Sequence, residues 1–68
     1  MAIETELRTL RNANDITQAE LAKEVGVSRQ TINAIETGKY NPSLELALKL
    51  ATYFETTVED IFSLQDER

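Results

Sequence analysis

The 68-residue sequence predicts a small all-α domain built from five short helices. Only Gly26, Gly38 and Pro42 interrupt the chain, and apolar residues recur at helical spacing between these positions. No stretch alternates strictly between apolar and polar residues, as a half-buried strand does. A chain of this length has little core beyond what one function needs. We therefore expect residues 1–68 to form one domain, with a core from about residue 3 to residue 64 and a polar tail at 65–68.

The first two helices are expected on either side of residues 14–15. The first ends there, and its apolar stripe consists of Leu7, Leu10 and Ala13, with Ile3 as an extension. The second begins at Thr17, because residues 17–20 have the spacing of a capping box: the Thr17 hydroxyl accepts from the N–H of Glu20, and the Glu20 carboxylate accepts from that of Thr17. This helix ends at Gly26. Its inward-facing residues are Leu21, Ala22 and Val25.

The remaining three helices each begin at a hydroxyl residue. Ser28 caps the third, which ends at Gly38, a residue suited to the left-handed conformation that follows many helices. Its inward residues are Ile32 and Ile35. Ser43 caps the fourth, which we expect to be central because apolar residues cover much of its circumference: Leu44, Leu46, Ala47, Leu48, Leu50, Ala51 and Phe54. Thr57 begins a short last helix through Val58, Ile61 and Phe62.

The composition excludes several classes of protein. There is no cysteine and no histidine, so a disulfide framework, a thiolate metal site and the commonest general base are all absent. Carboxylates are plentiful, but they occupy helix-capping and surface positions without a glycine-rich loop beside them. No apolar run approaches the length of a membrane span. We expect a protein that is not an enzyme, carries no cofactor or metal, is not bound to a membrane and lies in the cytoplasm.

The segment from Thr17 to Glu36 predicts a helix-turn-helix. Two short helices are joined by a tight turn at Gly26-Val27, where glycine can take a positive φ. Ala22 is small enough for the second helix to pack across it, and Val27 fills the angle between the helices. A helix-turn-helix can also have a purely structural role. The residues on the outward face of its second helix therefore have to indicate whether this one binds a ligand.

That outward face carries residue types that can form hydrogen bonds with the edges of base pairs. At about 100° per residue, it carries Gln30, Asn33, Ala34 and Thr37, with Arg29 at its edge. Arg can form two hydrogen bonds with guanine, Gln and Asn can do so with adenine, and a small alanine can approach a thymine methyl group. From Arg29 to Ala34 there is no carboxylate. The alternative is a polar helix surface that only keeps the protein soluble.

A longer pattern surrounds this face: Gln18-x-x-Leu21-Ala22-x-x-x-Gly26-Val27-Ser28-x-x-x-Ile32-x-x-x-Glu36-x-Gly38, continuing into Tyr40-Asn41-Pro42-Ser43. It resembles the Xre family of small prokaryotic regulators, which includes the Cro and phage-repressor DNA-binding domains, and the resemblance extends from about Leu7 to Phe62. It implies a compact five-helix DNA-binding domain of the phage-repressor type, whose second and third helices form the helix-turn-helix. It also implies binding to operator DNA as a homodimer.

The resemblance implies roles for individual residues as well. Arg29, Gln30 and Asn33 match positions that read bases, with Ala34 close to the groove. Gln18 matches a phosphate contact, and five further residues match capping and loop positions that meet the DNA backbone: Ser28, Thr37, Lys39, Tyr40 and Asn41. Arg11 and Glu36 match an internal ion pair. The alternatives are packing of Tyr40 on Pro42 and a solvated surface charge at Lys39.

The net charge of −5 is unusual for a protein that binds nucleic acid. Residues 1–42 hold five basic and six acidic residues, whereas residues 43–68 hold two basic and six acidic ones. The negative charge therefore lies mostly outside the segment expected to face DNA. We expect modest monomer affinity, low non-specific binding and a shallow salt dependence. A salt-rich cytoplasm is the alternative explanation of the acidity.

If one monomer binds DNA weakly, a homodimer compensates for it, because two linked copies on two half-sites bind far more tightly than one copy on one half-site. Four apolar residues are candidates for a two-fold interface: Ile3, Tyr53, Phe62 and Leu64. Alternatively, they only seal the small core.

The favoured function is a transcriptional regulator of double-stranded DNA that binds a palindromic operator, and a repressor is favoured over an activator. No small-molecule effector domain is expected. An antitoxin-like or anti-repressor module that binds protein is the alternative function.

Overall fold

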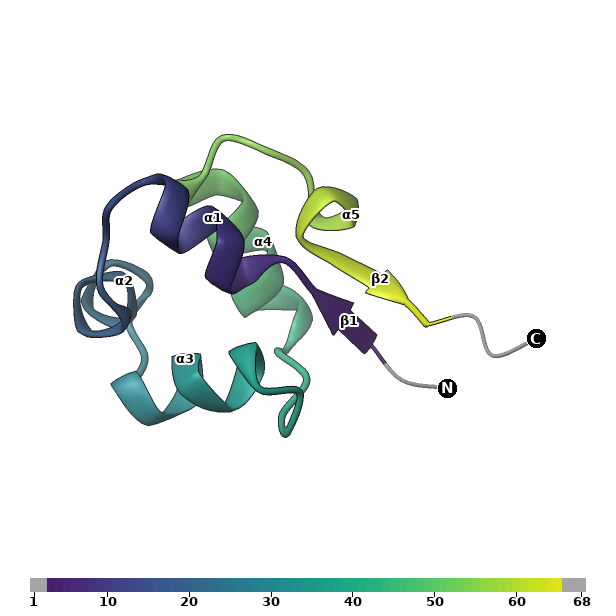
Figure 1. Ribbon diagram of the computed structural model, residues 1–68, viewed down its shortest axis with the longest axis horizontal. Helices are drawn as coiled ribbons and strands as arrows, with labels where there is room; N and C mark the ends of the chain where they lie inside the picture. The colour runs from purple at the N-terminus through teal and green to yellow at the C-terminus, as the bar shows by residue number, and fades with distance from the viewer. Residues whose placement is uncertain (1–2, 66–68) are drawn as a thin grey trace.

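The computed structural model describes residues 3–65 and contains five helices and two short strands (Figure 1). The predicted all-α class is confirmed, and the strands are an addition to it. In chain order the elements are β1 (Ile3–Thr5), α1 (Leu7–Ala13), α2 (Gln18–Val25), α3 (Arg29–Glu36), α4 (Leu44–Tyr53), α5 (Val58–Ile61) and β2 (Phe62–Leu64).

Four of the helices begin at the predicted hydroxyl caps. Each side-chain oxygen accepts a hydrogen bond from the backbone N–H three residues later, at Thr17, Ser28, Ser43 and Thr57. At the start of α2 the capping box is complete, because Glu20 also accepts from the N–H of Thr17 at 2.8 Å. These local bonds fix where α2, α3, α4 and α5 start.

Four turns that follow helices pass through the left-handed region. The expected glycines do so, with φ of 79° at both Gly26 and Gly38. Asp15 and Glu55 also do so, at φ of 54° and 55°, although neither was predicted to. After Glu55, the N–H of Thr56 donates to the carbonyl of Ala51 at 2.9 Å, and this bond closes the end of α4.

The core lies where α1 to α5 meet, and six side chains in it are almost completely buried: Leu7, Leu21, Ile32, Ile35, Leu50 and Ile61. Helix α4 contributes one face to this core, and α2 packs on it. Leu44 and Leu48 were among the apolar residues from which a central position of this helix was predicted, but they are 73% and 52% exposed and do not contribute to the core. Nothing within residues 3–65 covers that side of α4. Ala13, placed on the stripe of the first helix, is likewise exposed.

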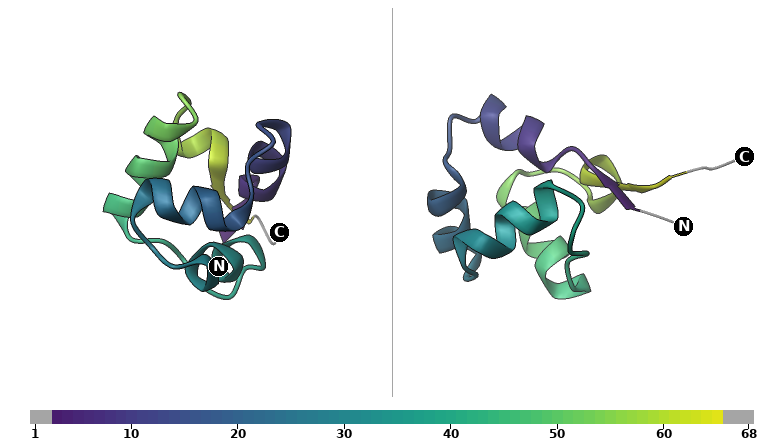
Figure 2. Two further views of the ribbon diagram at one scale, coloured as in Figure 1. Left: turned by 90° about the vertical axis from the view of Figure 1, so that its left-hand side faces the viewer. Right: turned by 60° about the horizontal axis from the view of Figure 1, so that its bottom comes forward.

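Strands β1 and β2 pair antiparallel, with Ile3 opposite Leu64 and Thr5 opposite Phe62 (Figures 1 and 2). The predictions that Ile3 extends the first helix and that the last helix includes Phe62 are therefore wrong. Three-residue strands are too short to show an alternating pattern, and they form because the folded domain brings residues 3–5 and 62–64 side by side. Of the expected polar tail, only Gln65 is described; residues 66–68 lie outside the described range.

Candidate nucleic-acid interface

Helices α2 and α3 form the predicted helix-turn-helix around Gly26. The positive φ of Gly26 turns the chain directly after α2, and the N–H of Val27 donates to the carbonyl of Ala22 at 3.0 Å. Ala22 is only 3% exposed, as close packing of the two helices requires. Val27 packs against the core from the turn. Local backbone geometry and a small side chain thus set how α3 sits on α2.

Helix α3 lies at one edge of the molecule (Figure 1), and its buried and exposed sides differ in chemistry. Ile32 and Ile35 are buried and hold the helix on the core. The candidate base readers Arg29, Gln30 and Asn33 are exposed. Ala34 is partly buried beside them. The α3 surface therefore presents long polar side chains outward from a helix that its apolar side holds in place.

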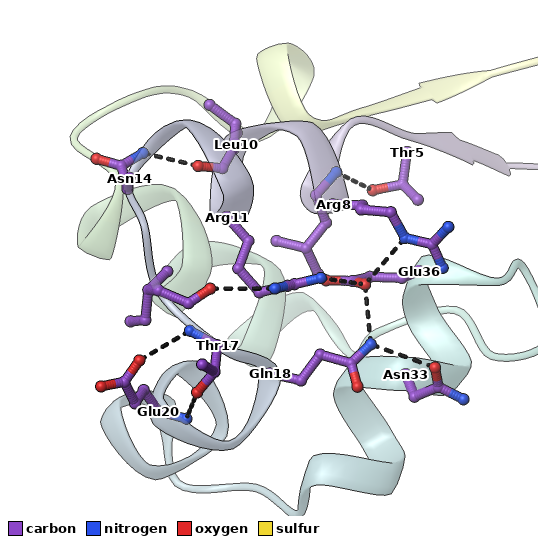
Figure 3. A network of polar contacts seen from close by, with 12 residues as sticks. Thr5, Arg8, Leu10, Arg11, Asn14, Thr17, Gln18, Glu20, Asn33 and Glu36 are labelled. Atoms are coloured by element: carbon purple, nitrogen blue, oxygen red, sulfur yellow. Dashed lines mark hydrogen bonds and ion pairs between the residues drawn. The ribbon is translucent and has the colours of Figure 1, made fainter.

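Glu36, at the end of α3, is paired inside the protein rather than exposed on this surface. Its side chain is 0% exposed, and Arg11 Nε lies 2.7 Å from its Oε2 atom (Figure 3). The Nη2 group of Arg11 donates to Oε1 of the same carboxylate at 3.2 Å, so the contact is bidentate. The Nη1 group of Arg11 donates to the carbonyl of Ile16. This is the internal ion pair that the resemblance implied.

Two further side chains reach Glu36 Oε1, and local sequence analysis identified neither contact. Gln18 Nε2 donates to it at 3.0 Å and also to Asn33 Oδ1 at 3.2 Å (Figure 3). Arg8 Nε lies 3.4 Å from it, with a side chain that is 57% exposed. Arg8 precedes Arg11 by three positions, so both face the same side of α1, and that spacing is the signal that could have identified Arg8.

The network affects the charge state of its members. Burial of the Glu36 carboxyl acts to raise its pKa. The hydrogen bonds from Arg11 and Gln18, together with the charge of Arg11, outweigh burial, so the pKa of Glu36 lies below its usual value. The hydrogen bond from Arg11 to Glu36 in turn raises the pKa of the Arg11 guanidinium. Glu36 is therefore a paired anion that presents no free carboxylate beside the base-reading candidates.

The candidates for contacts with the DNA backbone lie around the two helices. Ser28 Oγ is engaged as the cap of α3, and Thr37 Oγ1 donates to the carbonyl of Asn33 at 2.9 Å. Lys39, Tyr40 and Asn41 are exposed on the loop that leaves α3. Tyr40 as a whole residue is 49% exposed. The loop residues therefore retain surface available for a further contact.

The four candidate interface residues do not lie together. Ile3, Phe62 and Leu64 border one hollow beside the two strands. Tyr53 borders a different hollow, between α2 and α4. Leu64 is 66% exposed, whereas Phe62 is partly buried against the core.

None of the helices described over residues 3–65 is long and apolar enough to cross a membrane. Within that same part of the chain, no His, Cys, Asp or Glu side chains gather in a group that suits a metal ion.

Comparison with known proteins also identifies a helix-turn-helix in this chain. The helix-turn-helix family model matches residues 7–61, which span all five helices. The chain belongs to the Xre family of helix-turn-helix regulators. It is accordingly a DNA-binding transcriptional regulator.

Relatives of similar length occur in archaea and bacteria. The chain is 51% identical over 65 residues to an uncharacterised HTH-type transcriptional regulator of Methanocaldococcus jannaschii, covering 96% of this chain and 98% of the relative. It is 43% identical over 65 residues to the uncharacterised regulator YgzD of Bacillus subtilis, with the same coverage. Among solved structures, it resembles the restriction-modification controller protein C.AhdI of Aeromonas hydrophila. That match has a TM-score of 0.75 and 36% identity over 81% of this chain and 83% of C.AhdI.

Proposed function

We propose that this Xre-family regulator reads a specific operator by placing α3 in the major groove. The observation that carries the proposal is the exposed surface of α3, where Arg29, Gln30 and Asn33 stand free of carboxylates. Arginine pairs with guanine, and the two amides pair with adenine. Ala34 approaches the groove without obstructing it. The buried Ile32 and Ile35 keep these side chains on a rigid element, as precise reading requires.

Contacts to phosphate orient α3 in this proposal. The N-terminus of α2 offers the backbone N–H groups of Gln18 and Ala19, which have no acceptor inside the helix, together with the positive end of the helix dipole. On the other side of α3, exposed Lys39, Tyr40 and Asn41 follow the sugar-phosphate backbone. Ser28 and Thr37 contribute at the two ends of α3. These contacts set orientation and affinity rather than sequence preference.

We further propose that two copies bind a palindromic operator and thereby repress transcription. The protein would then act at the nucleoid, in the cytoplasm. Ile3, Phe62 and Leu64 form an apolar surface beside the paired strands, which suits a two-fold contact. Repression is favoured because a domain bound at a promoter blocks access simply by occupying it.

Selection of bound sites from random duplexes tests the reading of sequence. We expect enrichment of symmetric sites whose half-sites lie about one helical turn, 10–10.5 base pairs, apart. Arg29→Ala and Asn33→Ala should each relax preference at a particular position and cost about 1–3 kcal/mol of binding free energy. Lys49→Ala removes a similar charge from α4 and should leave the preference unchanged. A folded protein that enriches no site contradicts sequence-specific reading.

Sedimentation with and without operator DNA tests the dimer. Leu64→Glu should shift the protein toward monomer, because a charge at a two-fold contact faces its own copy. Thr9→Glu adds the same charge on the exposed side of α1 and serves as the control. If the unaltered protein is a strict monomer both free and on DNA, the two-fold contact does not exist.

A further inference from the structure

An apolar hollow of about 860 Å³ lies between α2 and α4, and the proposed DNA contacts do not use it. Leu44 and Leu48 line it from successive turns of α4, and the two residues are 73% and 52% exposed. Tyr53 borders its other end. Two exposed leucines on successive turns of one helix, beside a hollow, give α4 a surface on which another protein can pack.

The surface carries both halves of a self-complementary contact. Leu44 and Leu48 are exposed and line the hollow together with Val25 and Thr52. In a two-fold contact both partners present the same patch, so the exposed leucines of each copy pack against the hollow of the other.

The charges around the hollow also suit a second copy. Lys23 and Glu24 lie on α2, and Glu45 and Lys49 lie on α4, so two positive and two negative groups border it. Glu45 and Lys49 are 3.4 Å apart and already pair within one chain. The patch is therefore neutral, although the whole chain carries −5. Two acidic molecules repel each other least where their facing surfaces are neutral and mixed in sign.

We propose that this patch, defined by Leu44, Leu48 and Tyr53 with the four charges around them, binds the same patch of a second copy. The contact is separate from the one proposed at Ile3, Phe62 and Leu64, and it does not rest on that proposal. Where both contacts form, assemblies larger than a dimer result, and neighbouring operators are then occupied cooperatively.

Sedimentation velocity at high protein concentration tests this contact through Leu48→Glu. The variant should lose the larger species that the unaltered protein forms, while Thr9→Glu, which adds the same charge on α1, should retain it. An unchanged mass distribution for Leu48→Glu overturns the proposal. If Leu64→Glu changes nothing while Leu48→Glu prevents association, the strand-side dimer fails and this contact stands. Thermal unfolding of each variant shows that the fold is retained.

A pair of charge variants tests whether the patch faces itself. Lys23→Glu with Lys49→Glu makes the patch entirely negative, and Glu24→Lys with Glu45→Lys makes it entirely positive. Each double variant alone should fail to form the larger species, because like charges then face each other. An equimolar mixture should form it again. If the mixture stays dissociated, or if either variant alone associates like the unaltered protein, the patch does not bind its own copy.

Discussion

The side-chain amide of Gln18 donates a hydrogen bond of 3.2 Å to Oδ1 of Asn33 on the neighbouring helix. The same nitrogen lies 3.0 Å from Oε1 of Glu36, which Arg11 holds in place from α1. Since Oδ1 of Asn33 accepts from Gln18, the Nδ2 group of Asn33 is left to donate outward. The buried ion pair and the proposed base reader thus belong to one hydrogen-bonded network.

The first prediction is that Gln18 and Asn33 act as a unit in operator binding. Gln18→Ala and Asn33→Ala should each weaken binding, and the double variant should lose less than the two effects combined, with a coupling of about 1 kcal/mol. Gln18→Ala should also relax preference at the base pair that Asn33 reads. Fluorescence anisotropy on matched and single-base-altered operators measures both effects. Arg29→Ala is the reference, because Arg29 lies outside the network. Additive losses for Gln18 and Asn33 contradict the coupling.

The second prediction concerns the stability of the ion pair. Glu36→Ala leaves the guanidinium of Arg11, whose side chain is 13% exposed, without its carboxylate. Breaking a buried pair in this way costs about 3 kcal/mol of unfolding free energy. Arg8→Ala should cost less than about 1 kcal/mol, because its contact with Glu36 is exposed and long. Urea unfolding measures both. An unchanged stability of Glu36→Ala combined with altered operator preference would show that Glu36 is a recognition residue instead.

The third prediction is a pH dependence that arises from Glu36. Its pKa in the folded protein is lower than the usual value of 4.5, so the folded state binds this proton more weakly than the unfolded chain does. The stabilisation is therefore complete above the usual pKa and is lost as the pH falls through the lowered one. Unfolding free energies measured from neutral pH to about pH 3 should decline less steeply for Glu36→Gln than for the unaltered protein. Equal slopes for the two proteins contradict the assignment. Hydrogen bonds also lower the pKa of Glu20 and Asp60. Both proteins contain these two residues, so their contribution to the pH dependence of stability is the same in each.

The caps and the outward side of α3 could be predicted because they depend on residues close in sequence. The capping box at Thr17 and the left-handed glycines follow from bonds that span only a few residues. The contacts of Gln18 with Asn33 and of Arg8 with Glu36 span 15 and 28 positions, and they depend on how three helices pack. The pairing of Ile3 with Leu64 likewise requires the folded domain to bring both ends together. Periodicity within one segment shows that Arg8 and Arg11 share a side of α1, but it does not show which residue of another helix they meet.

Glu55 provides the fourth prediction. It adopts a φ of 55° after α4, a conformation that costs a residue with a Cβ atom about 1–2 kcal/mol relative to glycine. Glu55→Gly should therefore raise the unfolding free energy by about 0.5–1 kcal/mol, since the greater freedom of glycine in the unfolded chain offsets part of the gain. Glu55→Ala retains the Cβ atom and removes the same charge, so it should show no such gain. Equal stabilities of the two variants contradict the strain at this turn.

The last prediction follows from the distribution of charge over the folded domain. Glu36 is paired inside the protein and does not face the DNA as a free anion. Among residues 3–65, the cations on or next to α3 are Arg29, Lys39 and the exposed Arg8, which contacts Glu36 at the end of that helix. Each phosphate neutralised contributes about −0.9 to the slope of log K against log salt, so two or three contacts give about −2 to −3 per subunit. Lys39→Ala should make the slope about one unit shallower. On a DNA duplex with a single operator, where the proposed contact between neighbouring assemblies plays no part, Lys49→Ala should leave it unchanged, because Lys49 lies on α4 and pairs with Glu45. Titrations of operator binding over a range of KCl concentrations measure these slopes. A slope beyond about −5 per subunit would require more phosphate contacts than these cations supply.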